Sequence, residues 1–295
     1  MRPEVVRHLR CPNCHDPLAL TTPPRGPLRC PRGHSFDQAR QGYVQLTAAP
    51  LVHAGDNADM IAARSAFLGA GHYAAITAAL RAAAVAADVR RADVSGALVP
   101  GALPGALVLD VGAGTGHHLA GVLDGRPDAY GLATDVSKPA VRAAARAHPR
   151  IDAVLCDAWQ QLPLNDRSVD VALNVFAPRP GAEFARVLRP DGVLLVVTPM
   201  PAHLTELIEP LRLLHVDPAK SERVATALEE AFERSATQPV EAVMTLRPED
   251  VTTLVAMGPS AWHTEPDERA ARIAALPTPM QVTLSVTVAT YHPRR

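Results

Sequence analysis

The sequence has few of the features that would place the chain in a membrane or outside the cell. No stretch reaches the roughly 18 consecutive apolar residues that a membrane-spanning helix needs. The first residues, Met-Arg-Pro-Glu-Val-Val-Arg-His, lack the apolar core of a secretory signal peptide. Internal repeats are also absent. We therefore expect a cytoplasmic globular protein that makes no membrane contact.

The chain also has little net charge. Its 29 basic and 30 acidic residues give a formal net charge of −1, so the whole molecule has no general attraction to nucleic acid. The first 50 residues differ, because they hold seven arginines against Glu4, Asp16 and Asp37. This local excess fits either an anionic partner or an ordinary solvated surface.

Cysteine is scarce, yet three of the four cysteines lie within the first 30 residues. Cys11, Cys14, Cys30 and His34 follow the pattern C-x2-C-x15-C-x3-H, and two such knuckles are typical of a tetrahedral structural zinc site. A disulfide with one loose cysteine is the alternative, which reducing compartments disfavour. His15 is a poorer ligand than His34 because it directly follows Cys14. Cys156 is expected in the core.

The most informative motif spans residues 107–116, Leu-Val-Leu-Asp-Val-Gly-Ala-Gly-Thr-Gly. A run of strand-forming residues reaches an acid, Asp110, and then Gly112, Gly114 and Gly116 alternate. Glycine allows a tight turn in which bare backbone can approach a ligand, and the following helix offers unpaired N–H groups. The motif predicts a site for a nucleotide-like small molecule.

The glycine spacing indicates which molecule binds. A dinucleotide site reads G-x-G-x-x-G, whereas this turn reads G-x-G-x-G and resembles motif I of S-adenosylmethionine (SAM) methyltransferases. Asp135 ends the next expected strand, 19 residues beyond Gly116, and suits the ribose hydroxyls. Asp157 follows another apolar run, where this family contacts the adenine. Alternatively, either acid is an ordinary turn or N-cap residue.

From residue 106 onward, expected strands and helices alternate, which predicts an α/β fold. It is a Rossmann-like SAM methyltransferase with a mostly parallel seven-stranded sheet, preceded by a small zinc ribbon. We expect a ribbon at 1–46, a helical connector and linker at 47–105, and the methyltransferase domain at 106–295, with a helical insertion at 248–276 and a long helix at 218–236. The expected core strands are 106–110, 129–134, 152–156, 169–175 and 192–198.

A zinc ribbon before a SAM methyltransferase resembles the RlmA-type 23S rRNA (guanine-N1)-methyltransferases. The similarity is greatest to the actinobacterial branch, whose tylosin-resistance member modifies guanine 748 in hairpin 35. The stretches that carry the resemblance are 11–14, 30–37, 41–44, 70–73, 135–141, 174–179, 198–204 and 256–263.

The resemblance implies the zinc ligands named above and a substrate in hairpin 35 of 23S rRNA, with macrolide resistance in some members. It also implies SAM contacts from Tyr73, Gly116, His117 and His203. From loop position alone, Asn174 and Phe176 are candidates to bind and stack on the target guanine. The arginines expected to grip the RNA backbone are Arg7, Arg10, Arg29 and Arg32.

Two other functions remain open at this point. The SAM motifs fit a methyltransferase of a small molecule, such as an antibiotic precursor, equally well. A binding protein that senses SAM without catalysis would also carry them. A homodimer is compatible with holding one RNA hairpin from two sides.

Overall fold

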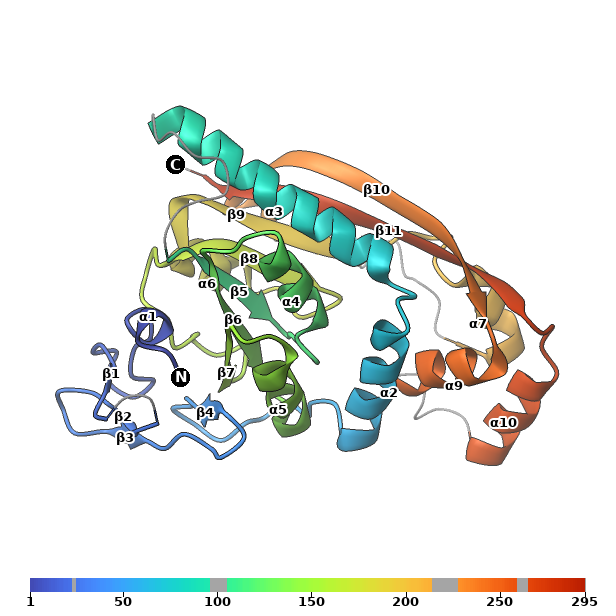
Figure 1. Cartoon of the computed structure of the whole chain (residues 1–295), viewed down its shortest axis with the longest axis horizontal. Helices are drawn as coiled ribbons and strands as arrows, with labels where there is room; N and C mark the ends of the chain where they lie inside the picture. The colour runs from blue at the N-terminus through green and yellow to red at the C-terminus, as the bar shows by residue number, and fades with distance from the viewer. Residues whose placement is uncertain (23–24, 96–104, 214–227, 259–264, 295) are drawn as a thin grey trace.

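A computed structural model describes residues 1–22, 25–95, 105–213, 228–258 and 265–294 (Figure 1). Its centre is an eight-stranded sheet in the order β10-β11-β9-β8-β5-β6-β7-β4, in which β10, β11 and β9 pair antiparallel and the other neighbours are parallel. The strands are β4 (Tyr43–Gln45), β5 (Leu107–Val111), β6 (Tyr130–Asp135), β7 (Ile151–Leu155), β8 (Val169–Val175), β9 (Leu188–Pro199), β10 (Phe232–Leu246) and β11 (Met280–Pro293).

Helices cover both faces of the sheet, as expected for parallel strands. Side chains of β5 alternate between two cores: Val108 joins the first, and Leu107 and Leu109 join the second. The first core lies beneath α3 (Ala74–Ser95), α4 (His117–Asp124) and α5 (Lys138–Ala147). The second includes residues of α1 (Pro3–Val6) and α6 (Gly181–Val187).

The expected seven strands are joined by an eighth, β4, which the sequence analysis placed in the ribbon. Tyr43, Val44 and Gln45 pair in parallel with Ala153, Val154 and Leu155 of β7. The ribbon itself is a three-stranded antiparallel sheet of β1 (Ala19–Leu20), β2 (Leu28–Arg29) and β3 (Ser35–Phe36). Its Cys11, Leu18 and Leu28 belong to the second core. The ribbon therefore packs against the sheet and shares its core.

The long β10–β11 hairpin extends to a helical lobe, at the lower right of Figure 1. The lobe contains α2 (Ala58–Gly69), α7 (Thr205–Leu211), α9 (Pro248–Ala256) and α10 (Pro266–Ala274). Asn57 caps α2, because its Oδ1 accepts a hydrogen bond from the Met60 N–H at 2.9 Å. Helices α9 and α10 lie within residues 248–276, where the sequence analysis expects a helical insertion; that insertion stays a prediction, and residues 259–264 lie outside the described part.

The expected helix at 218–236 is wrong at its end, because β10 already begins at Phe232; residues 214–227 lie outside the described part. Pairing with β11 outweighs the local helical pattern there: Phe232 opposes Pro293, and its side chain is fully buried in the second core.

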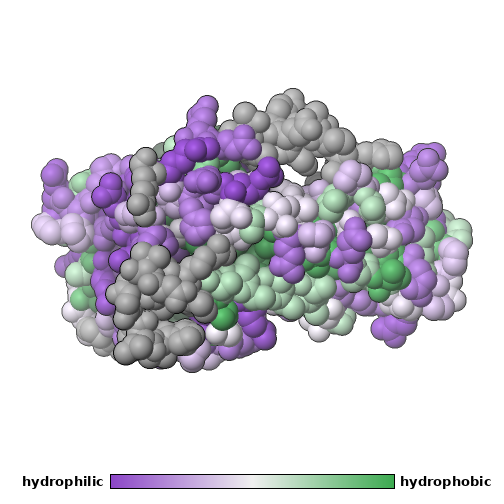
Figure 2. Space-filling view, turned by 90° about the horizontal axis from the view of Figure 1, so that it is seen from above, coloured by the Kyte–Doolittle hydropathy of each residue, from purple (hydrophilic) through white to green (hydrophobic). Residues whose placement is uncertain are grey.

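The outward face of α3 carries the exposed alanines Ala74, Ala78 and Ala82. From above, Figure 2 shows a weakly hydrophobic band along the middle of this side and hydrophilic side chains gathered toward its left end.

Among the described residues, no helix is both long and apolar enough for a bilayer crossing.

Candidate cofactor and metal sites

The glycine turn sits at the carboxyl end of β5, next to the point where the chain order reverses across the sheet. Gly112, Gly114 and Gly116 all adopt left-handed conformations, with φ of 73°, 54° and 74°. The Gly112 N–H donates to the Thr134 carbonyl at 2.9 Å, which ties the turn to β6. Open α/β sheets bind ligands in such a crevice.

Two acids lie beneath the turn. Asp110 is 2% exposed, and burial, with a smaller contribution from the nearby Asp135, raises the pKa of its carboxyl to about 7. Asp135 accepts hydrogen bonds from the Gly114 and Ser137 N–H groups, both at 2.9 Å. Burial also raises the pKa of Asp135. A cationic ligand would relieve the cost of ionising this pair.

The raised pKa of Asp110 predicts a measurable pH dependence. An ordinary aspartate has a pKa near 3.9, so between about pH 4 and 7 the folded protein binds more protons at Asp110 than the unfolded chain does. The folded state should therefore lose up to about 4 kcal/mol of stability from this group as pH rises through that window.

Denaturant unfolding of the ligand-free protein and Asp110→Asn at several pH values measures this effect. The variant should gain stability relative to wild type as pH rises from 4 to 7. If the difference in unfolding free energy between the two proteins did not change with pH, the raised pKa of Asp110 would be refuted.

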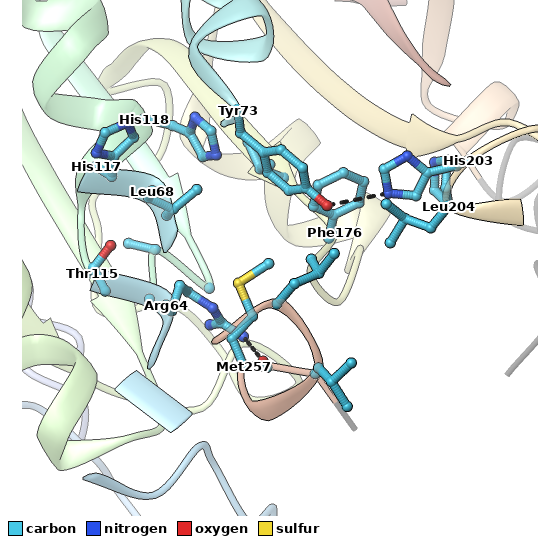
Figure 3. A pocket seen from close by; sticks show the side chains of 18 of the residues that line it. Arg64, Leu68, Tyr73, Thr115, His117, His118, Phe176, His203, Leu204 and Met257 are labelled. Atoms are coloured by element: carbon cyan, nitrogen blue, oxygen red, sulfur yellow. Dashed lines mark hydrogen bonds between the residues drawn. The ribbon is translucent and has the colours of Figure 1, made fainter. Parts of the chain in front are cut away.

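A cavity of about 370 Å³ opens at the glycine turn (Figure 3). Its polar side is lined by Asp110, Thr115 and His117 from the turn and by Arg64 from α2. Its other side is lined by the rings of Tyr73, Phe176 and His203. Apolar residues of the helical lobe complete it: Leu204, Ile208, Leu213, Leu254, Val255 and Met257. One space thus joins the expected cofactor site to an aromatic wall.

The aromatic wall consists of Tyr73, Phe176 and His203. The Phe176 and His203 rings are stacked at 6.0 Å, and Tyr73 Oη lies 3.4 Å from His203 Nε2. The Ser285 N–H donates to His203 Nδ1 at 3.2 Å. Burial lowers the pKa of His203 to about 4, so the ring is neutral near pH 7 and carries its proton on Nε2.

The loop after β8 places Asn174 and Phe176 differently. Phe176 is 43% exposed in the left-handed region, φ 52°, a conformation that is uncommon for a bulky residue. Asn174 is fully buried: its Nδ2 donates to the Pro178 carbonyl at 2.7 Å, and its Oδ1 accepts from Arg179 Nε at 2.8 Å. In this structure the Asn174 amide shapes the loop, so a contact with the guanine edge stays a prediction that would need these hydrogen bonds to rearrange.

Asp135 and Asp157 end β6 and follow β7 as expected, but neither lines the cavity. Asp157 is 3% exposed; its Oδ2 lies 2.7 Å from His53 Nδ1, and its Oδ1 accepts from the Trp159 N–H at 3.0 Å. Among the polar lining residues, sequence reasoning missed Arg64, Thr115 and His118. Thr115 lies inside the recognised motif, whereas Arg64 carries no motif signal.

The four expected zinc ligands converge in the ribbon. The ligand atoms of Cys11, Cys14, Cys30 and His34 all lie within 4.8 Å of one another. Cys14 Sγ is 3.6 Å from Cys30 Sγ, and His34 Nδ1 is 3.5 Å from Cys11 Sγ and 3.3 Å from Cys30 Sγ. A tetrahedral zinc ion requires about 3.8 Å between sulfurs and about 3.6 Å between sulfur and nitrogen. The residues fit one structural Zn²⁺, and all four cysteines are free of disulfides.

The four candidate RNA-binding arginines are not equivalent. Arg10 forms an ion pair with Asp166 at 3.2 Å, and Arg32 pairs with Asp16 at 2.9 Å. Arg7 and Arg29 are exposed, and within the described part of the chain they make neutral hydrogen-bond contacts without an ion pair: Arg7 with His8 and the Gly105 carbonyl, and Arg29 with Ser35. These two are more available to a polyanion than the paired arginines are.

Comparison with known proteins supports both the expected methyltransferase domain and the expected zinc ribbon. A model for the methyltransferase domain matches residues 108–192, and one for the N-terminal zinc ribbon of RlmA matches residues 9–50. The chain is 49% identical to the 23S rRNA (guanine(748)-N(1))-methyltransferase of Streptomyces fradiae, over 99% of each chain. It belongs to the 23S rRNA (guanine-N1)-methyltransferase family.

Two further relatives carry names from this family. A Micromonospora griseorubida protein is 56% identical over 99% of this chain and all of its own, and YxjB of Bacillus subtilis is 30% identical over 88% of each. The family assignment agrees with the expected Rossmann-like fold, the SAM motif and the zinc ribbon.

Proposed function

We propose that this family member transfers a methyl group from SAM to N1 of a guanine in hairpin 35 of 23S rRNA, at the position equivalent to 748. The observation that carries the proposal is the cavity in which the glycine turn and the aromatic wall meet, in a chain that matches a guanine(748) enzyme end to end.

The glycine turn fits SAM. A Cβ atom on Gly112 would lie 2.6 Å from Ala177 Cβ, so the backbone must be bare there. The buried acids Asp110 and Asp135 favour a cationic ligand such as a sulfonium. When bound, SAM supplies an electrophilic methyl group on a positively charged sulfonium sulfur, which leaves as a neutral thioether. We assign Asp135 to the ribose and Asp157 to the adenine, from their places after β6 and β7.

The aromatic wall fits a purine. Stacking of a base on an aromatic side chain contributes about 1–3 kcal/mol, and Phe176 offers an exposed ring over the cavity. The neutral His203 donates from Nε2 and so suits a carbonyl or hydroxyl acceptor. His203 and Tyr73 keep their proposed role as SAM contacts, since they line the same cavity as the glycine turn. Guanine N1 lies on the pairing edge, so the target base must leave its stack to enter.

Primer extension across hairpin 35 tests the proposal, since N1-methylguanine blocks pairing and stops reverse transcriptase. Reverse transcriptase should stop at guanine 748 on RNA from the strain that carries this gene, and it should read through this position on RNA from the deletion strain. Absence of any difference would overturn the rRNA assignment in favour of a small-molecule substrate or a SAM sensor. Tylosin susceptibility of the deletion strain tests whether the modification confers resistance.

The exposed arginines of the ribbon provide a second arm of the same test. Arg7→Gln with Arg29→Gln should restore the stop less efficiently than wild type on complementation. In vitro the variant should bind the RNA more weakly and with a shallower salt dependence, so its deficit should shrink at higher salt. Arg142→Gln, an exposed arginine of α5, is the matched control. Equal restoration by both proteins would exclude Arg7 and Arg29 from the RNA contact.

A further inference from the structure

Arg64 gives the cavity its only permanent positive charge among the described lining residues. The other basic side chains that line it are His117, His118 and His203. Burial lowers the pKa of each, to about 3 for His118 and about 4 for His203, so they are neutral near pH 7. An anionic group that enters this space therefore has one cation to pair with.

The guanidinium of Arg64 is held over the glycine turn. Its Nη1 lies 3.0 Å from the position that a Cβ on Gly114 would take. Nη1 also lies 2.6 Å from Asp56 Oδ2, and Nη2 donates to the Met257 carbonyl at 2.9 Å (Figure 3). These contacts come from the chain before α2 and the end of α9, and they fix the guanidinium plane. An arginine has five N–H donors, so further donors are left for a ligand.

A second polar group at this end of the cavity has no partner among the described residues. Thr115 is 7% exposed and lines the cavity, and its Oγ1 has no hydrogen-bond partner within the described residues. It directly precedes Gly116 and the first turn of α4, whose unpaired N–H groups favour an anion. A buried hydroxyl without a partner is costly, which indicates that a ligand atom completes its hydrogen bonding.

We propose that Arg64 and Thr115 together bind the α-carboxylate of the cofactor's methionine group. This inference rests on the proposed function, because it assumes that the cofactor is SAM. A carboxylate offers two oxygens, which matches a guanidinium edge on one side and a hydroxyl on the other. The adjacent Asp110 then faces the cationic part of the same molecule. An RNA phosphate at Arg64 is the competing occupant.

Equilibrium binding without RNA tests the proposal. The ligands are S-adenosylhomocysteine and its decarboxylated analogue, S-adenosyl-3-thiopropylamine, which keeps the adenosine, the thioether and the amine. The proteins are wild type, Arg64→Gln, Thr115→Val and the surface control Arg142→Gln. Arg64→Gln should weaken S-adenosylhomocysteine binding about 10- to 100-fold and Thr115→Val somewhat less. Binding of the decarboxylated analogue should change less than about threefold, which also shows that each variant is folded.

Three results would overturn the inference. Equal weakening of both ligands in Arg64→Gln would mean that the arginine only supports the cavity through Asp56 and Met257. Unchanged S-adenosylhomocysteine binding together with weaker binding of a hairpin 35 RNA would assign Arg64 to a phosphate. Failure of wild type to bind either ligand would reject the SAM assignment, and thus the proposed function, instead of the role of Arg64 alone.

Discussion

Cys30→Ser is expected to abolish stoichiometric zinc binding and to unfold the ribbon. Cys30 Sγ is central to the site, lying 3.6 Å from Cys14 Sγ and 3.3 Å from His34 Nδ1. Structural zinc contributes an apparent free energy of about 10–16 kcal/mol in small zinc domains, and removal of one thiolate forfeits much of it. Zinc content by mass spectrometry should fall from about one ion per chain to a small fraction.

The effect should extend beyond the ribbon, because Cys11, Leu18 and Leu28 belong to the core under one face of the main sheet. Loss of the ribbon exposes that core, so the melting temperature of the whole protein should fall by several degrees. Limited trypsin digestion should cleave within residues 1–50, where arginines are frequent. Cys156→Ala is the control: this buried cysteine lies outside the cluster and should retain zinc. Full zinc content in Cys30→Ser would contradict the ligand set.

Gly112→Ala is the second change with a large expected effect. Its φ of 73° is strained for alanine by about 1–2 kcal/mol. The added Cβ would lie 2.6 Å from Ala177 Cβ, so the loop after β8 must shift. Overpacking of this kind costs about 1–3 kcal/mol. Since that loop carries Phe176, the shift should disturb both walls of the cavity.

Calorimetric binding of S-adenosylhomocysteine should show at least about a tenfold loss for Gly112→Ala, with a lower melting temperature. Gly69→Ala is the matched control, because Gly69 ends α2, has no heavy atom within 4 Å of its Cβ position and does not adopt a left-handed φ. That variant should be neutral or up to about 1 kcal/mol more stable. Wild-type ligand affinity in Gly112→Ala would mean that the turn does not form the cofactor site.

The features that the sequence predicts well are those in which local chemistry determines the structure. Alternating glycines after a buried strand allow only a few turns, and the structure has all three in left-handed conformations. The cysteine and histidine spacing likewise brings four ligand atoms together with little dependence on the rest of the chain. Both signals depend on backbone freedom or ligand chemistry, which neighbouring elements scarcely alter.

Features that depend on distant partners were harder to predict. β4 has only three residues, and its place in the main sheet is set by β7, more than a hundred residues later. Asn174 has the right loop for base recognition, but Arg179 and Pro178 use its amide. Arg64 reaches the cavity only because α2 folds back over the glycine turn, which no local pattern encodes. Tyr73 and His203 were found through the family resemblance alone.

The position of β4 also imposes an order on the folding of the nascent chain. The four zinc ligands all lie within residues 11–34, so the knuckles can close without the strands of the main sheet. Val44 and Gln45, by contrast, pair with Val154 and Leu155, which emerge from the ribosome much later. A parallel strand with so distant a partner adds slowly, after the strands between them have formed. β4 precedes β5, β6 and β7 in the chain, yet it is among the last strands to join the finished sheet.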